Sequence, residues 1–316
     1  MRIAITGSGG QLGAELVRVL RPHHETVALE HRAHDVADVA IVEAIVALRP
    51  DCVVHAAAMT DVDGCARDPE RAFLANGFGT RNVAQACLEA GAALCYVSTN
   101  EVFDGAQDAP YREWDDPRPI NAYGASKLAG ERFALTICPR TYVVRTAWLY
   151  GPASERNFVR KIIAAADRLG GPVSPSPSPS PIKGEGTDTA VLKGGPQGTG
   201  ALRVVADEVG SPTYAPDLAE AIAALIERRA YGVYHLVNAG GASRYEFAQA
   251  ILRLAGRAHV RIEPIALSDW PRDSTPPPQT RLHNAYAAAL GIVLRPWREA
   301  LAEYLVATAT LRAAAP

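Results

Sequence analysis

The sequence has few features of a protein that binds membranes or nucleic acid. Basic and acidic side chains are nearly balanced among its 316 residues, at 32 and 34, so no strongly charged surface for nucleic acid or acidic lipid is expected. No apolar run approaches the roughly 20 residues of a membrane span. Met1 leads directly into the strand-like run Arg2–Thr6, without a signal-peptide pattern. We therefore expect a cytoplasmic protein.

The cysteines are also few, and their spacing excludes two further classes. There are five of them, an odd number, with no Cys-x-x-Cys pair and no zinc-type spacing to the eight histidines. A disulfide framework is therefore not expected. We predict that most are buried thiols in a reducing compartment.

Short apolar runs alternate with helix-length amphipathic segments, which is typical of βαβ units. We predict a Rossmann-type, doubly wound parallel sheet of the α/β class, with Cys52–Ala58 in its middle because that run is apolar on both faces. The predicted strands are Ile3–Thr6, Thr26–Leu29, Cys52–Ala56, Leu94–Ser98, Tyr142–Thr146, Leu202–Val205 and Val233–Val237. The predicted helices are Gln11–Leu20, Val39–Leu48, Pro69–Ala90, Asn121–Ile137, Asp217–Arg228, Tyr245–Leu254 and Trp297–Val306.

The length suits two parts. We assign residues 1–150 to a dinucleotide-binding domain, to which about 202–235 return, and residues 151–316 mainly to a smaller C-terminal α/β part that binds substrate. Residues 170–200 are rich in proline, serine and glycine. Such a composition cannot bury a core, so we interpret this stretch as a surface insertion without a catalytic role.

A glycine-rich loop lies between the first predicted strand and helix. Gly7, Gly10 and Gly13 allow a tight turn, close approach of a pyrophosphate, and close packing of helix on strand, respectively. The helix N-terminus then directs its N–H groups toward the anion. We predict dinucleotide binding here, with Gln11 and Leu12 also in contact.

The second strand is followed by residues that bear on the choice of coenzyme. Glu30 lies 20 residues after Gly10 (30 − 10), where an acidic side chain would bind the adenosine ribose of NADH, whereas Arg32 could hold the 2′-phosphate of NADPH. Both coenzymes therefore remain open. Asp35 either approaches the adenine or caps the next helix.

Tyr123 and Lys127 are spaced i and i+4, on one face of a predicted helix. A reductase must protonate the alkoxide that forms as hydride reaches a carbonyl, and a nearby ammonium lowers the pKa of a phenol toward neutrality. With four lysines and 11 tyrosines in the chain, about 0.14 such pairs are expected by chance (11 × 4/316). We predict that Tyr123 is the proton donor, and that Lys127 tunes it and holds the nicotinamide ribose.

A third group must hold the carbonyl oxygen. The strand that ends at Ser98 and Thr99 delivers two hydroxyls to the carboxyl edge of the sheet, where ligands bind in such folds. Thr99 is the first choice and Ser98 the reserve.

These motifs, together with Arg49–Ala58, Asn76, Val102–Gly105, Arg145–Gly151, Val209–Thr213 and Trp297–Leu301, resemble the dTDP-4-dehydrorhamnose reductases over nearly the whole chain. The resemblance implies reduction of the 4-keto group of a dTDP-4-dehydro-6-deoxy-L-hexose to dTDP-L-rhamnose, a step of polysaccharide biosynthesis. Thr99, Tyr123 and Lys127 fall on the family's catalytic positions. Further positions match coenzyme contacts (Ala57, Ala58, Asn76) and substrate contacts (Trp148, Asn157). An asparagine that caps backbone is the alternative for Asn76, and core packing is the alternative for Trp148.

Three features depart from the family. It usually reads Ser-Thr-Asp-Tyr-Val-Phe where this chain has Ser98-Thr-Asn-Glu-Val-Phe103, which places Glu101 beside the expected carbonyl site. Pro276–Pro278 replace a stretch that usually carries an arginine near the phosphates, so Arg281 is the candidate replacement. Some relatives dimerise through a magnesium-bound glutamate cluster, of which only Glu15 is matched here. We expect no metal, and either a monomer or a homodimer.

Two other functions fit parts of the pattern. The first is a sugar-nucleotide epimerase or dehydratase, because Thr99-Asn-Glu101 resembles the dehydratase Thr-Asp-Glu, although an amide cannot act as the required acid. The second is a non-catalytic NAD(P)-binding regulatory subunit, like those of methionine adenosyltransferase. The intact Tyr123/Lys127 pair favours an enzyme.

Overall fold

A six-stranded parallel sheet forms the centre of the molecule. The structure is a computed structural model that describes residues 1–155, 157–170, 191–192 and 200–313. The order of strands in this sheet is β11-β5-β4-β3-β1-β2, and each neighbouring pair is parallel. Its members are β1 (Arg2–Thr6), β2 (Glu25–Leu29), β3 (Cys52–His55), β4 (Ala93–Thr99), β5 (Thr141–Thr146) and β11 (Gly232–His235).

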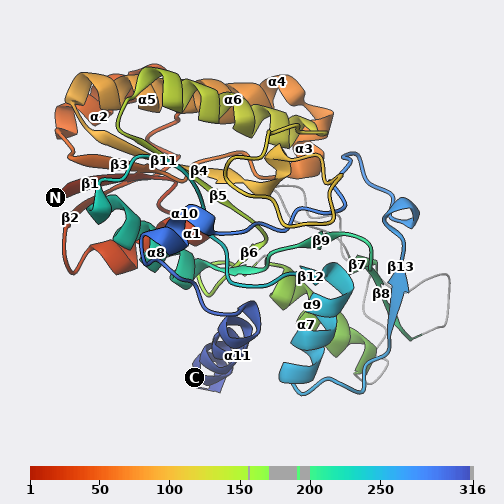
Figure 1. Cartoon of the computed structure of the whole chain (residues 1–316). Coiled ribbons are helices and arrows are strands. Elements are labelled where there is room, and N and C mark those ends of the chain that lie inside the picture. The colour runs from red at the N-terminus through yellow and green to blue at the C-terminus, as the bar shows by residue number, and fades with distance from the viewer. Residues whose placement is uncertain (156, 171–190, 193–199, 314–316) are drawn as a thin grey trace.

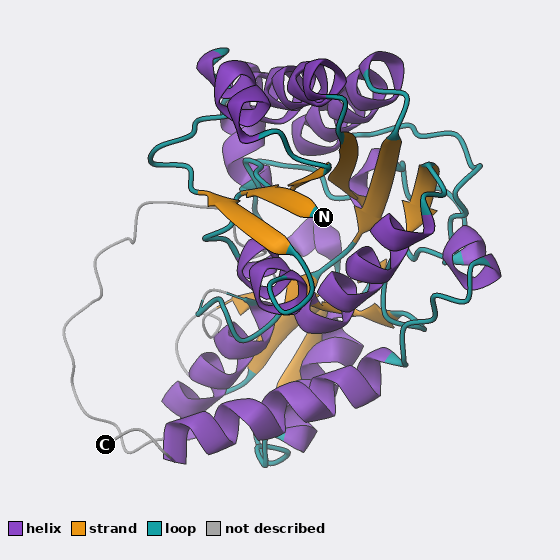
Figure 2. Cartoon of the chain, turned by 90° about the vertical axis from the view of Figure 1, so that its left-hand side faces the viewer, coloured by secondary structure: helices purple, strands orange, loops and turns teal. Residues whose placement is uncertain are grey.

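Helices cover both faces of the sheet (Figures 1 and 2). On one face lie α2 (Ala40–Leu48), α5 (Gly79–Ala90) and α6 (Ala122–Ile137); on the other lie α1 (Gln11–Leu20), α8 (Ala215–Arg228) and α10 (Ala285–Ala289). Strands β3 and β4 are buried along their whole length, which explains their continuous apolar sequence. The predicted Rossmann-type fold, with β3 inside the sheet, is therefore confirmed.

The chain reverses direction across the sheet between β1 and β3. From β1 it runs outward to β2 and then returns to place β3 on the other side of β1. This switch point lies at the carboxyl edge of the sheet, where ligands bind in open α/β folds. Topology thus brings the glycine loop beside the loop that follows His55.

Helices α3 (Val62–Arg67) and α4 (Pro69–Ala72) follow β3, and a π-helical stretch, η1 (Phe73–Phe78), joins α4 directly to α5. The predicted helix Pro69–Ala90 is thus present, but with one widened turn that contains Asn76. Widened turns of this kind occur frequently at functional sites.

The second part of the molecule packs around its own apolar core. This part consists of α7 (Phe158–Gly170), α9 (Arg244–Leu254), α11 (Trp297–Ala313), β6 (Leu149–Tyr150), β7 (Val191–Leu192), β8 (Leu202–Val205), β9 (Val209–Gly210), β10 (Thr213–Tyr214), β12 (Ala242–Ser243) and β13 (Ile262–Ile265), with the short helix η3 (Leu267–Asp269). Aromatic rings fill its centre: Phe247 contacts Tyr150, Phe158 and Trp297 with ring centroids 5.5–5.6 Å apart. Three small sheets surround this core.

One assignment to the main domain needs correction. We expected residues 202–235 to return to the main sheet, and α8 and β11 do so, but β8 pairs with β7 and β13 in a separate three-stranded sheet. The strand pattern of Leu202–Val205 did not reveal which sheet would receive it. The predicted insertion, 170–200, lies outside the described residues except at its two ends and at β7.

No helix in the described ranges is long and apolar enough to cross a membrane.

The aromatic core of the second part generates a stability prediction. Phe247 is 1% exposed, so Phe247→Ala should remove about 3–5 kcal/mol from the free energy of unfolding through lost burial and a residual cavity. Urea unfolding monitored by fluorescence measures this. Val293→Ala, at a side chain 78% exposed, is the control and should change stability by less than about 0.5 kcal/mol. Equal effects would contradict the assigned core.

Candidate active site

The glycine loop packs so closely that two of its glycines cannot be replaced without a clash. Gly7 has a φ of +68°, and a Cβ there would lie 2.6 Å from the backbone nitrogen of Ala57. A Cβ on Gly13 would overlap the carbonyl oxygen of Gly7. Gly10 donates its N–H to that same carbonyl at 2.9 Å and begins α1. The start of α1 therefore packs against the glycine loop, and the loop in turn packs against the chain that follows β3.

The residues of this loop fit an anionic dinucleotide. Gln11 and Leu12 occupy the first turn of α1, where backbone N–H groups have no partner within the helix. The Leu12 side chain is buried in the core, so only its backbone is available to a ligand. The hydroxyl of Ser8 is buried without a hydrogen-bond partner and lies in the same loop. Ala57 and Ala58 follow β3 next to this loop and are half-buried.

The residues expected to choose between coenzymes lie after β2. Glu30, Arg32 and Asp35 are all exposed, and within the described chain neither Glu30 nor Arg32 forms an ion pair. Asp35 does not cap α2, because α2 begins at Ala40; its carboxylate instead accepts the N–H of Ala37 at 3.0 Å. All three remain available for an adenosine ribose or its phosphate.

Asn76 connects the loop after β3 to helix α6. Its side chain accepts the Met59 N–H at 2.8 Å and donates to both the Met59 carbonyl and the Ser126 hydroxyl at 3.0 Å. It is 1% exposed. These hydrogen bonds are those expected of an asparagine that caps backbone. Through them Asn76 fixes the loop that follows Ala57 and Ala58.

Sequence reasoning missed a buried polar chain beneath this loop. His55 bonds Thr6 through Nδ1 at 2.7 Å and Thr80 through Nε2 at 3.2 Å, and Thr80 donates to the carbonyl of Asn76 at 2.6 Å. Burial lowers the pKa of His55 to about 3, so this ring is neutral. A histidine inside an otherwise apolar strand was the available signal. It holds β1, β3 and the widened turn η1 together.

Helix α6 begins directly on the turn after β4, and Gly124 is the reason. Any Cβ at Gly124 would overlap the carbonyl oxygen of Glu101 in the short helix η2 (Asn100–Val102). Asn121 caps α6 by accepting the Gly124 N–H at 2.8 Å. Tyr123 therefore stands beside the end of β4, where Thr99 lies. The sequence pattern Tyr-Gly-Ala-Ser-Lys contained this glycine, but not its steric role.

Lys127 lies under Tyr123, fully enclosed. It is 2% exposed, its Nζ donates to the Val97 carbonyl at 2.7 Å, and it sits 4.3 Å from the centre of the Tyr96 ring. Burial lowers the pKa of Lys127 to about 7. Its ammonium is therefore in balance with the neutral amine near physiological pH.

The Thr99 hydroxyl is held at the end of β4. It accepts the Glu101 N–H and lies 3.2 Å from the Asn100 side-chain oxygen, to which it donates. Asn100 in turn donates to the Thr280 hydroxyl at 2.6 Å. The C-terminal segment thus contacts the site through Thr280.

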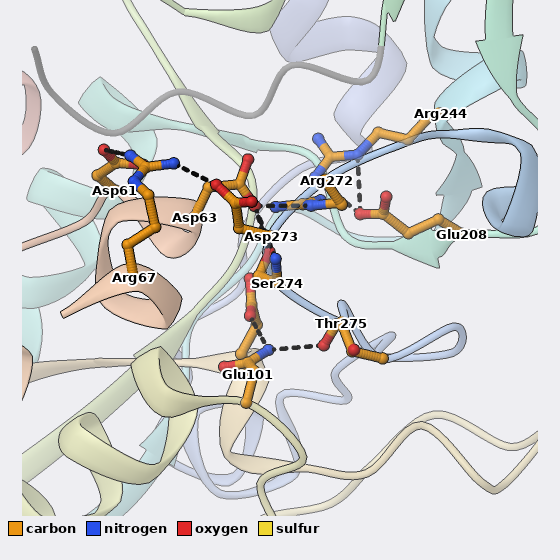
Figure 3. A network of polar contacts seen from close by, with 11 residues as sticks. Asp61, Asp63, Arg67, Glu101, Glu208, Arg244, Arg272, Asp273, Ser274 and Thr275 are labelled. Carbon is orange, nitrogen blue, oxygen red and sulfur yellow. Dashed lines mark hydrogen bonds and ion pairs between the residues drawn. The ribbon is translucent and has the colours of Figure 1, made fainter. Parts of the chain in front are cut away.

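Glu101 belongs to a network of polar contacts that holds the C-terminal segment in place (Figure 3). Its carboxylate accepts a hydrogen bond from Asn121 at 2.7 Å, and Asn121 also donates to the Thr275 carbonyl at 3.1 Å. Nearby, Asp63 accepts from Arg272 and from the Ser274 hydroxyl. Burial alone would raise the pKa of Asp63, but the hydrogen bonds from Ser274 and the charge of Arg272 outweigh it, so this pKa is lowered. Glu101 therefore contacts the N-cap of the Tyr123 helix.

Two predicted substrate contacts, Ser98 and Asn157, form hydrogen bonds within the protein. Ser98 points away from Thr99 into the protein and donates to Glu131 at 2.6 Å, because neighbouring residues of a strand face opposite sides. The Asn157 amide donates to the Gly151 and Ser154 carbonyls and to Tyr304, and its oxygen accepts the Arg160 N–H. The Asn157 amide therefore forms its hydrogen bonds within the protein, around the loop before α7.

Three further predicted residues have partners that the sequence did not indicate. The Arg244 guanidinium lies 3.5 Å from the centre of the Trp148 ring, and Trp148 also contacts Gly210 and has a φ of +44°. Arg281 donates to the Asp108 carbonyl and packs on Gly241. Glu15 is buried and paired with Arg18 at 2.7 Å, and the described residues hold no cluster of potential metal ligands.

A glycine loop at the switch point of a parallel sheet, with a tyrosine and a buried lysine one turn apart on one helix, is the pattern of the nicotinamide-dependent oxidoreductases of the short-chain dehydrogenase type. Within this class, the chain belongs to the RmlD substrate binding domain family, whose model matches residues 1–170 and 189–310.

Similar proteins cover nearly the whole chain. A dTDP-4-dehydrorhamnose reductase of Mycobacterium tuberculosis is 36% identical over 98% of this chain and 93% of its own. A dTDP-4-keto-6-deoxy-D-glucose reductase of Streptomyces niveus is 34% identical over 96% of both chains. The solved dTDP-4-dehydrorhamnose reductase of Bacillus anthracis, in complex with NADP, is 32% identical with a TM-score of 0.83, over 96% of this chain and 98% of its own. This confirms the family resemblance.

The packing of α1 on the glycine loop generates a first test at the site. Gly13→Ala should push α1 away from the glycine loop, lower the unfolding temperature and weaken NADPH binding, because its Cβ would overlap the backbone of Gly7 and Ser8. Gly9→Ala is a matched control for stability, since a Cβ there has open space around it. Thermal melts and fluorescence titration with NADPH measure both effects. Equal melting temperatures for the two variants would contradict the close packing.

The seating of α6 generates a second test. Gly124→Ala should displace the first turn of α6 from Glu101 and lower kcat roughly 10- to 100-fold, because small misplacements of catalytic groups are costly. Steady-state kinetics measure this. Thr136→Ala, on the exposed side of the same helix, should leave kcat unchanged. A fully active Gly124→Ala enzyme would show that the contact does not position Tyr123.

Proposed function

We propose that this chain reduces the 4-keto group of a dTDP-4-dehydro-6-deoxy-L-hexose, converting dTDP-4-dehydrorhamnose to dTDP-L-rhamnose with NADPH or NADH. The observation that carries the proposal is the seating of α6 on the turn after β4. This contact supports the proposal because it holds the helix of Tyr123 and Lys127 against the turn that follows Thr99, at the edge of the sheet where the glycine loop also lies.

Each residue has a defined role in this reaction. The bound coenzyme supplies the hydride. Thr99 holds the carbonyl oxygen as negative charge develops there, and Tyr123 donates the proton to that oxygen. Lys127 in its ammonium form favours the resulting phenolate and binds ribose hydroxyls. Asn76, Ala57 and Ala58 shape the coenzyme side, whereas Glu101 supports Asn121 at the start of α6.

The rival functions are less well supported. Elimination of water needs an acid next to Thr99, but that position holds Asn100, an amide that bonds Thr99 and Thr280. A purely regulatory subunit would not need the buried, enclosed Lys127. Among reductases, relatives named for dehydrorhamnose and for 4-keto-6-deoxy-D-glucose both align over nearly the whole chain, so the second sugar is the alternative substrate.

The remaining features follow the same proposal. Exposed Glu30 and Arg32 support use of either coenzyme. All five cysteines are free and buried, which suits the reducing cytoplasm where these coenzymes are found. The enzyme works as a monomer or homodimer in this proposal, without a metal ion.

The direct test is incubation with dTDP-4-dehydrorhamnose and NADPH or NADH while the absorbance of the reduced nicotinamide is followed. We expect stoichiometric coenzyme oxidation, and Tyr123→Phe should lower kcat roughly 100- to 10,000-fold with nearly unchanged coenzyme affinity. Conversion of the sugar without net oxidation would favour an epimerase or dehydratase. A fully active Tyr123→Phe variant would exclude Tyr123 as the proton donor.

A further inference from the structure

A buried ionic cluster lies one turn along α6 from Lys127. Glu131 on α6 accepts a hydrogen bond from Ser98 at 2.6 Å and is bound by two nitrogens of Arg145 at 2.8 and 3.0 Å. Glu131 and Arg145 are 2% and 3% exposed. The cluster joins α6 to β4 and β5 directly behind the proposed proton donor.

The spacing places Glu131 next to Lys127. Residues four apart on a helix are neighbours on one face, and both side chains point toward the sheet because both are buried. Two opposite charges at this separation interact strongly where solvent is excluded. Arg145 adds a positive charge on the far side of Glu131 and so offsets part of its effect.

The other groups that face Lys127 carry no charge. From β4 come the Val97 carbonyl and the Tyr96 ring, from β3 comes His55, and from α3 comes Cys65. Burial raises the pKa of Tyr96, raises that of Cys65 to about 12 and lowers that of His55 to about 3. On its own helix Lys127 faces Tyr123 and Glu131. The Glu131–Arg145 pair is therefore the source of fixed charge at this position.

We propose that the Ser98–Glu131–Arg145 cluster sets the protonation state of Lys127 and thereby the proton supply to Tyr123. Glu131 and Arg145 are positioning residues with opposite effects: the carboxylate favours the ammonium form, and the guanidinium limits that effect. The link to proton supply rests on the function proposed above, whereas the control of Lys127 does not.

The sign of each substitution follows from its charge. Glu131→Gln leaves the positive charge of Arg145 without its partner, which disfavours the ammonium of Lys127. Arg145→Met leaves the carboxylate of Glu131 without its partner, which favours that ammonium. The double variant removes both charges, so the ammonium of Lys127 should be disfavoured, but less than in Glu131→Gln, because Arg145 offsets only part of the effect of Glu131. Arg145→Lys keeps the positive charge and should resemble the unaltered protein.

The experiment is an NMR titration of the full chain without ligands, with lysine labelled at the side-chain carbon and nitrogen. The chain has only four lysines, and Lys127→Met assigns the signal. We expect the Lys127 midpoint to fall by about one pH unit in Glu131→Gln and to rise by about one in Arg145→Met. Asp217→Asn removes a remote ion pair with Arg295 as the control and should leave the midpoint in place. The double variant keeps the test decisive if a single variant does not fold.

The activity profile then tests the link to catalysis. The loss of turnover at high pH should move to lower pH in Glu131→Gln and to higher pH in Arg145→Met, in step with the NMR midpoints. Unchanged midpoints, or midpoints that move in the same direction in both variants, would overturn the proposal. Midpoints that move as expected without the activity profile would overturn the link to proton supply. Absence of turnover in the unaltered protein, with the midpoints moving as expected, would instead reject the proposed function.

Discussion

The contact between the first turn of α6 and the end of β4 is the constraint on which the site depends. Gly124 allows the helix backbone to lie against the Glu101 carbonyl, and Asn121 fixes the same turn from outside. Lys127, one turn further on, is pinned to β4 through the Val97 carbonyl. Together these contacts fix the position of the helix that carries Tyr123 and its rotation about its own axis.

Buried polar groups support this arrangement from two sides. On one side, His55 bonds the end of β1 and Asn76 holds the loop after β3. Behind Lys127, Glu131 and Arg145 form an ion pair with almost no access to solvent. Buried ion pairs contribute little net stability, because desolvation opposes their attraction. Their persistence next to the site is consistent with a role in setting its charge.

The C-terminal segment joins the two parts of the molecule over the site. Thr280 bonds Asn100, the Thr275 carbonyl accepts from Asn121, and Asp63 binds Arg272 and Ser274. These contacts show where two of the three departures from the family pattern lie. Glu101 contacts the cap of α6, and Pro278 packs on Gly105 in the same segment. Both departures therefore concern contacts between the C-terminal segment and the chain that follows β4.

The sequence by itself determined the parallel sheet, the glycine loop and the Tyr123/Lys127 helix, because each depends on local periodicity or on spacing along one element. Only the tertiary structure decided the environments of Ser98, Asn157 and Trp148, since their partners Glu131, Tyr304 and Arg244 lie far away in the chain. The same holds for the sheet that receives Leu202–Val205, because strand patterns do not specify which neighbour they pair with. These partners are brought together by packing between segments that are far apart in the chain, so no local sequence pattern predicts them.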